Sequence, residues 1–232
     1  MQSGFLSLLI LILIHCFANQ TMVFGWLWHG RFLSFAAGIS FAYVFVDLLP
    51  SLEKGQPILK QTFGDVIPYL DRHAYLIALL GVLVYYGLQS SSTTNAARSF
   101  WCKISGYLLF NLFVGASLAD SNNPDIQPLF LFTIAMGMHY FIHDHNVSVD
   151  NPELYTHEVR WLLVIALCLG YTVGYFTHIP DAVVAVIVSF LAGGMILNAL
   201  RYELPKREQL GYTFFVIGAL GYTAVLLGVG EV

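Results

Sequence analysis

Eight long apolar stretches dominate this 232-residue sequence and restrict what it can fold into. A helix needs about 20 predominantly apolar residues to cross the hydrocarbon core of a membrane. Only 10% of the residues are charged, whereas about 25% are charged in a typical soluble domain. The sequence therefore predicts an all-α, polytopic membrane protein with eight transmembrane helices. The predicted helices cover residues 4–26, 32–50, 73–90, 100–119, 128–146, 160–177, 181–201 and 209–229.

The connections between these stretches are rich in Pro, Gly, Ser and charged residues, so they are predicted to be loops. The longest covers residues 52–72. No segment has the composition of a separate soluble domain, and residues 1–232 are expected to form a single transmembrane domain. Residues 5–14 have the length of a signal-peptide core, but no basic residue precedes them and no small-x-small cleavage site follows. A retained first helix is therefore expected.

One segment of the sequence occurs twice in altered form. FAAGISFAYVFVDLLP at residues 35–50 returns as FLAGGMILNALRYELP at residues 190–205, with no gap between matched positions. Each copy begins with Phe, has Ala-Gly two and three residues later, and ends in Leu-Pro. Membrane transporters commonly pair two related groups of helices around a central site. The repeat therefore predicts an internally symmetric membrane protein, although it carries no chemistry of its own.

The distribution of basic residues predicts the orientation of the helices. Short loops with more Lys and Arg face the cytoplasm. With the N-terminus outside, the inner side holds Arg31, Arg98, Lys103, Arg160, Arg201, Lys206 and Arg207, and the outer side holds Lys54, Lys60 and Arg72. The excess of basic residues on the inner side predicts that both termini lie outside. The two copies of the repeat are then antiparallel across the membrane. The predicted fold is therefore an inverted repeat, in which helices 1–3 match helices 6–8 and enclose helices 4 and 5.

Polar residues occur in the middle of predicted helices 4 and 5, where a substrate site is expected. Asn111 lies in helix 4, and His139 in helix 5 is followed four residues later by His143, on the same helical face. Asp144 and His145 come next. Two imidazoles at this spacing can hold one divalent metal, and carboxylates can complete the shell. Two other interpretations stay open: residues 143–145 form a solvated helix end, and Asn111 makes an interhelical hydrogen bond.

Two motifs in helices 4 and 5 resemble those of the ZIP family of zinc and iron permeases. The family motif His-Asn-x-x-Asp-Gly of helix 4 falls on Phe110-Asn111-Leu112-Phe113-Val114-Gly115, and its motif His-Glu-x-Pro-His-Glu of helix 5 falls on His139-Tyr140-Phe141-Ile142-His143-Asp144. Predicted helices 2 and 7 also resemble the corresponding helices of the family. The resemblance covers nearly the whole chain and implies eight helices, both termini outside, and a metal site on helices 4 and 5.

The match to the family motifs is incomplete. In helix 4 the His and the Asp are replaced by Phe110 and Val114, and in helix 5 the first Glu is replaced by Tyr140. The bridging acid of a binuclear centre is therefore missing. The resemblance then implies one reduced metal site, formed by Asn111, His139, His143 and Asp144.

Three further residues are candidates for the path of the ion to and from this site. Asp47 stands where the family often has a His at the outer end of helix 2, and it either collects cations or caps the helix end. Glu203 is the related acid at the inner end of helix 7, where a metal exit and an ion pair with Arg201 both stay open. His145 either receives the ion together with Asp144 or is an ordinary solvated residue.

Together these observations predict a transporter of divalent metal that works by alternating access between helices 2 and 7 and the rest of the protein. Zinc is the favoured ion, with iron and manganese as the other candidates. Small residues in the two repeat copies let helices approach closely, namely Ala37, Gly38, Ala192, Gly193 and Gly194. The plasma or inner membrane is the expected location. The expected partners are the lipid bilayer and the metal ion; a homodimer stays open, and a net charge of −4 gives no reason to expect nucleic acid.

Two other function classes stay open. A non-transporting ZIP-like sensor or partner subunit fits the lost ligands. A membrane-embedded metal-dependent hydrolase needs a third metal-ligating His from another helix, and the sequence places neither His15 nor the remaining histidines convincingly in that role. His139 and His143 also have the spacing of the zinc-protease helix motif, but Tyr140 replaces the Glu that acts there as general base. The protein is therefore not expected to be an enzyme.

Overall fold

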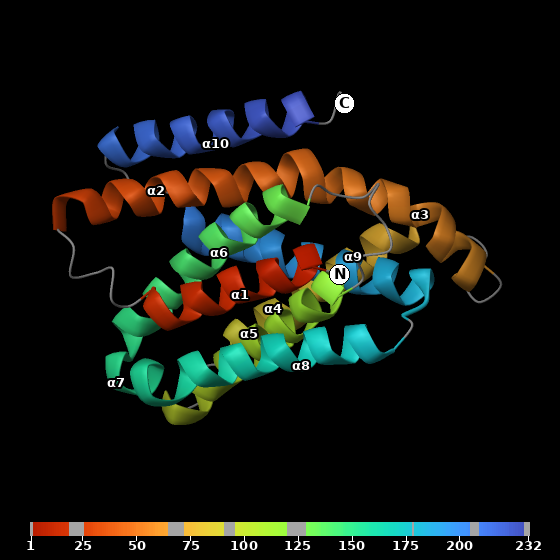
Figure 1. The fold of residues 1–232 in the computed structure, drawn as a ribbon, viewed down its shortest axis with the longest axis horizontal. Coiled ribbons are helices and arrows are strands. Elements are labelled where there is room, and N and C mark those ends of the chain that lie inside the picture. The colour runs from red at the N-terminus through yellow and green to blue at the C-terminus, as the bar shows by residue number, and fades with distance from the viewer. Residues whose placement is uncertain are drawn as a thin grey trace.

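The computed structural model describes residues 2–18, 26–64, 72–90, 96–119, 129–177, 179–204 and 209–229. Within these ranges all regular structure is helical, and there is no strand. Eight helical segments follow one another, and each covers most of one predicted stretch (Figure 1). They are α1 (Gln2–Phe17), α2 with η2 and α3 (Trp26–Tyr43, Val44–Leu48 and Leu49–Phe63), α4 (His73–Gln89), α5 (Ala96–Ala119), α6 (Leu129–Asp150), α7 with η3 and α8 (Pro152–Leu154, Tyr155–Val159 and Arg160–Phe176), α9 with η4 (Asp181–Asn198 and Ala199–Glu203) and α10 (Gln209–Val229).

The second segment is longer than predicted, and the first is shorter. A loop was expected over residues 52–72, but the helix continues through α3 to Phe63, and residues 65–71 lie outside the described part. Leu52 and Leu59, seven residues apart, are buried in the main core, whereas Lys60 is exposed, so α3 is amphipathic. Burial of this apolar face keeps the chain helical beyond the expected end. In α1 the helix stops at Phe17 instead of residue 26, and residues 19–25 are not described.

The connection predicted between helices 5 and 6 is also largely helical. α6 continues to Asp150, and α7 and η3 lead directly into α8. Tyr155, Val159 and Leu163 recur every four residues, and they are buried in a small apolar cluster with Ile104 of α5. This spacing places them on one helical face, so tertiary contact stabilises a helix in a segment whose charged residues predict a loop.

Five helices of the described part are long and apolar enough to cross a membrane. They are Gly30–Phe63, Ala97–Ala119, Pro152–Phe176, Asp181–Glu203 and Gly211–Gly228. α1 and α4 are shorter apolar helices. Large apolar side chains also lie on the outer surface: Leu220 of α10 is 66% exposed and Phe176 of α8 is 78% exposed. Such an outer surface suits contact with lipid better than contact with water.

In three pairs of helices, glycines on both partners bring the two backbones into close contact. Between α2 and α10, which lie side by side in Figure 1, Gly218 faces the carbonyl oxygen of Phe35, and Gly38 faces a carbonyl oxygen of α10. A Cβ atom at either glycine would lie closer than 3.0 Å to that oxygen. Between α5 and α8, Gly115 and Gly170 make the same kind of contact. Only a residue without a side chain fits these crossings.

The third pair, α4 and α9, repeats the contact between α2 and α10. Gly81 faces the carbonyl oxygen of Phe190, and Gly193 faces a carbonyl oxygen of α4. Phe190 and Gly193 hold, in the second copy of the sequence repeat, the positions that Phe35 and Gly38 hold in the first. The π-helical turns η2 and η4 also fall on matching positions of the two copies. The two copies therefore share local structure as well as sequence.

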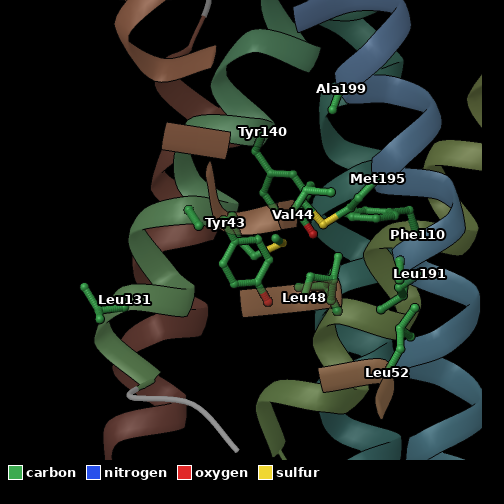
Figure 2. Close-up of a cluster of buried hydrophobic side chains, with 14 of the residues drawn as sticks. Tyr43, Val44, Leu48, Leu52, Phe110, Leu131, Tyr140, Leu191, Met195 and Ala199 are labelled. Atoms are coloured by element: carbon green, nitrogen blue, oxygen red, sulfur yellow. The ribbon is translucent and has the colours of Figure 1, made fainter. Parts of the chain in front are cut away.

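A layer of apolar side chains fills the centre of the bundle (Figure 2). We call the following set the apolar layer: Tyr43, Val44, Leu48, Phe110, Tyr140 and Met195. Each of these side chains is at most 4% exposed. In Figure 2 the buried side chains continue from Ala199, the first residue of η4, to Leu191 of α9. The apolar layer thus lies beside the polar residues near the end of α9.

Candidate functional site

Helix α6 presents two histidines on one face, one turn apart. Nδ1 of His139 lies 2.6 Å from Oε1 of Glu203, and Nδ1 of His143 lies 3.2 Å from Oδ1 of Asp144. An ionised carboxylate only accepts hydrogen bonds, so each Nδ1 donates, and in the neutral imidazole Nε2 then keeps its lone pair. Histidines that ligate metals are usually held by a carboxylate in this way. Each of the two histidines therefore has one nitrogen that can bind a cation.

A cavity of about 640 Å³ reaches these histidines from one end of the bundle. Its lining extends from the exposed residues Asp150 and Tyr202 to the buried residues His139 and Glu203, and it includes His143. His143 Nε2 and Glu203 Oε2 are buried and have no hydrogen-bond partner in the described ranges. Buried polar atoms nearly always have a hydrogen-bond partner. These two cavity-lining atoms are therefore candidates to contact a bound ligand.

The local structure explains why these side chains meet. α6 is continuous for 22 residues, so the four-residue spacing of His139 and His143 becomes proximity on one face. Glu203 is the last residue of η4, where it is 4% exposed, and it comes to His139 from a different part of the sequence. Ser40 of α2 lies 3.4 Å from the same His139 nitrogen. The site therefore joins the fifth helical segment to both copies of the repeat.

A second polar network lies next to the cavity, and it centres on His15 of α1. Nδ1 of His15 lies 2.6 Å from Oδ2 of Asp144, and Nε2 of His15 lies 2.8 Å from Oδ1 of Asn111. Asn111 Nδ2 donates to the backbone oxygen of Tyr107 at 2.9 Å. His15 and Asp144 are both fully buried. Asp144 accepts hydrogen bonds from both His15 and His143, so it connects the network to the cavity.

The predicted site residues fall into three groups. His139, His143 and Glu203 line the cavity. Asn111 and Asp144 do not line it, but they join the network of His15. Asp47 and His145 belong to neither group: Asp47 is half-buried in η2, and His145 is partly buried on α6. Nowhere in the described ranges do three His, Cys, Asp or Glu side chains converge as metal ligands do.

One interpretation of the sequence needs correction. Residues 143–145 are not a solvated helix end, because α6 continues to Asp150 and Asp144 is fully buried. The role expected for Asp144 and His145, to receive the ion on the inner side, stays a prediction, and neither residue lines the cavity. Asp144 contacts the cavity residue His143. The interhelical hydrogen bond considered for Asn111 is present, with His15 as the partner.

His15 is the residue of this region that sequence reasoning missed. An ionisable residue inside an apolar helix is a functional hypothesis by default, so its place in α1 was a usable indication. Its sequence separation from Asn111 and Asp144 gave no hint that the three would meet. Asn198 and Tyr202, which also line the cavity, lie within the second repeat copy and carry no spacing pattern that distinguishes them.

Comparison with known protein families and with curated proteins found no relative of this chain. No model of a known protein family matches the chain, and no curated protein is similar to it in sequence. The fold and the site themselves define the class: in the described ranges the protein is all-helical, five helices are long and apolar enough to span a membrane, and a cavity ends at two histidines and a glutamate.

Proposed function

We propose that this protein is a multi-pass membrane transporter for a divalent metal cation, with zinc as the favoured ion and iron or manganese as the other candidates. One observation carries the proposal. His139 and His143 line a cavity on one face of α6, and each donates Nδ1–H to a carboxylate, which leaves Nε2 for a cation. Imidazole nitrogen suits zinc well, whereas manganese prefers oxygen ligands.

The charge at the buried end of the cavity supports a cation as cargo. Glu203 is the carboxylate there, and its Oε2 lacks a hydrogen-bond partner in the described part. An ionised carboxylate in a low-dielectric site attracts a cation strongly, because Coulomb interactions are weakly screened there. The second carboxylate, on Asp144, is already paired with His15. In this proposal the ion binds to the two imidazoles, and Glu203 balances part of its charge.

Alternating access is supported by the cavity and by the apolar layer. The cavity gives His139 access to one end of the bundle, and the apolar layer lies next to the site without polar side chains of its own, apart from two tyrosine hydroxyls. The hydroxyl of Tyr140 is buried without a hydrogen-bond partner in the described ranges. A rigid-body movement that separates this layer would open the site to the other end.

The two repeat copies supply elements that could move in this way. We infer an inverted repeat, because α2 with α10 and α4 with α9 make matching glycine contacts, and because η2 and η4 match as well. The first turn of α1 and the last turn of α10 lie at the same end of the bundle in Figure 1. In the proposed orientation both termini face outward in the plasma or inner membrane, and the cavity, with Lys103 in its lining, opens toward the cytoplasm.

The alternative of a membrane hydrolase is less well supported than transport. That alternative calls for a third ligating histidine from another helix, and His15 of α1 does approach Asp144. Both ring nitrogens of His15 are hydrogen-bonded to oxygen atoms, however, and His15 does not line the cavity. It therefore offers no lone pair to a metal in the cavity. We accordingly propose a role other than enzymatic catalysis.

The proposal is tested by uptake of Zn²⁺ into proteoliposomes that contain the full chain. We expect uptake by the wild type and a loss of at least about tenfold for His139→Gln and for His143→Gln, because each removes one metal-binding nitrogen. His157→Gln is the control, since His157 is exposed in η3 and does not line the cavity, and its uptake should stay at the wild-type level.

Two results would count against transport. Absence of Zn²⁺, Fe²⁺ and Mn²⁺ uptake by the wild type, combined with stoichiometric binding that depends on His139, would favour the sensor or partner-subunit interpretation. Equal uptake by the wild type and both histidine variants would show that the cavity histidines do not handle the ion at all.

A further inference from the structure

The orientation of the Asn111 amide group shows whether Nε2 of His15 carries a hydrogen. The amide nitrogen of Asn111 donates to the backbone oxygen of Tyr107 at 2.9 Å, so its oxygen must point the other way. That oxygen lies 2.8 Å from Nε2 of His15. An amide oxygen only accepts hydrogen bonds, and a short contact between two acceptors would be repulsive. Nε2 of His15 therefore carries a hydrogen and donates it to Asn111.

The other ring nitrogen of His15 faces a carboxylate. Nδ1 lies 2.6 Å from Oδ2 of Asp144, which is the length of a strong, charge-assisted hydrogen bond. With hydrogens on both nitrogens, His15 is an imidazolium paired with the Asp144 carboxylate. Neither side chain is exposed, and a buried carboxylate without a partner is very costly. His15 thus supplies the charge that lets Asp144 stay ionised inside the bundle.

The second oxygen of Asp144 then determines the tautomer of His143. Oδ1 lies 3.2 Å from Nδ1 of His143, and an ionised carboxylate accepts a hydrogen there. Nε2 of His143 is left with its lone pair, next to the cavity, and has no other partner in the described ranges. His15 thus donates to Asn111 and to Asp144, and Asp144 accepts a second hydrogen bond from His143 through its other oxygen.

We propose that His15 is a positioning residue of the cation site, which acts through Asp144 to keep His143 in the tautomer that can bind a metal. The inference rests on the proposed function, because it assumes that His143 Nε2 receives the cation. Without His15, Asp144 would lose the donor that holds Oδ2, and Oδ1 would no longer be fixed opposite Nδ1 of His143. The hydrogen of His143 would then be shared between its two nitrogens, and the form with a lone pair on Nε2, which binds the cation, would be less populated.

The test combines a tautomer measurement with Zn²⁺ affinity, both on the full chain in detergent micelles. His15→Phe keeps a ring for the contact with Tyr140, whose centroid lies 4.4 Å from that of His15, but it removes both N–H donors. We expect the ¹⁵N NMR signals of His143 to change from the Nδ1–H tautomer to a mixture of the Nδ1–H and Nε2–H tautomers, and Zn²⁺ affinity to fall about 10–100-fold. His15→Lys restores a positively charged donor and should recover part of the lost affinity. His157→Gln, at an exposed residue outside the cavity lining, should match the wild type in both measurements.

If His15→Phe fails to fold, the ¹⁵N spectrum of the wild type alone still tests the inference. Before metal is added, its ¹⁵N spectrum should show two protonated nitrogens on His15 and the Nδ1–H tautomer on His143. A neutral His15, or the Nε2–H tautomer on His143, would overturn the inference. If the wild type binds Zn²⁺ and His15→Phe changes neither affinity nor tautomer, the positioning role is wrong while transport still stands. If the wild type binds no metal, the proposed function is wrong. The protonation of His15 and the tautomer of His143 then still test the hydrogen bonds that these residues make with Asp144.

Discussion

The glycine contacts between α2 and α10 lead to a sharp prediction about stability, because the same helix contains its own control. Gly218 is buried, and a Cβ atom there would lie closer than 3.0 Å to the carbonyl oxygen of Phe35. Gly221, three residues later, is exposed and has no atom within 4 Å of the position of such a Cβ. Alanine at the two positions therefore adds the same methyl group to one helix in opposite surroundings.

The expected magnitude follows from the geometry. At Gly221 alanine should stabilise α10 by about 0.5–1 kcal/mol, since it restricts the unfolded chain and favours the helix. At Gly218 the opposing group is backbone, so the helices must part by about 1 Å, and that separation weakens their dispersion contacts by a quarter to a half. Overpacking of this kind costs about 1–3 kcal/mol. The two variants should therefore differ in free energy of unfolding by about 1.5–4 kcal/mol.

The measurement is equilibrium unfolding of Gly218→Ala, Gly221→Ala and the wild type in mixed micelles, followed by far-UV circular dichroism. Gly221→Ala should unfold at or above the wild-type midpoint, and Gly218→Ala well below it. If the two variants unfold at the same midpoint, α2 and α10 do not approach as closely as described. The reasoning about matching contacts in the two repeat copies would then be wrong as well.

Two further predictions concern the membrane and the buried polar groups. Leu220→Lys places a charge near the middle of α10 on a surface that is 66% exposed, and it should raise the free energy of membrane insertion by about 3 kcal/mol in a glycosylation-mapping assay; unchanged insertion would contradict lipid contact at this face. Gln89→Leu removes the donor to Asn198, whose contact is 2.7 Å long, and it should lower stability by about 1–3 kcal/mol in a thermal unfolding assay. An unchanged midpoint would show that this hydrogen bond is not needed.

Local features of the site were accessible from the sequence, and distant partners were not. The proximity of His139 and His143 is a property of any α-helix, because residues four apart lie on one face. Glu203 was a candidate because of its place in the second repeat copy, yet its contact with His139 depends on α2, against which both η4 and α6 pack. His15 was set aside, because nothing in the order of residues relates it to Asp144.

The lengths of the helices show the same division. The core of each helical segment was predictable, since about 20 apolar residues in sequence specify a helix that can cross a membrane. The helical course of α3 was not, because Pro50, Pro57 and its charged residues predict a loop. Burial of Leu52 and Leu59 in the core outweighs those local preferences. Packing thus decided where the second segment ends.

The sequence by itself determined an all-helical chain with eight segments, a repeat with glycines at matching positions, and two histidines on one face of a helix. These are consequences of composition and of spacing along the chain, which act over a few residues. The tertiary structure alone decided that His15 pairs with Asp144 and that Glu203 meets His139. Those contacts join residues far apart in sequence, and they form only when the packing of several helices brings the side chains together in a buried, low-dielectric interior.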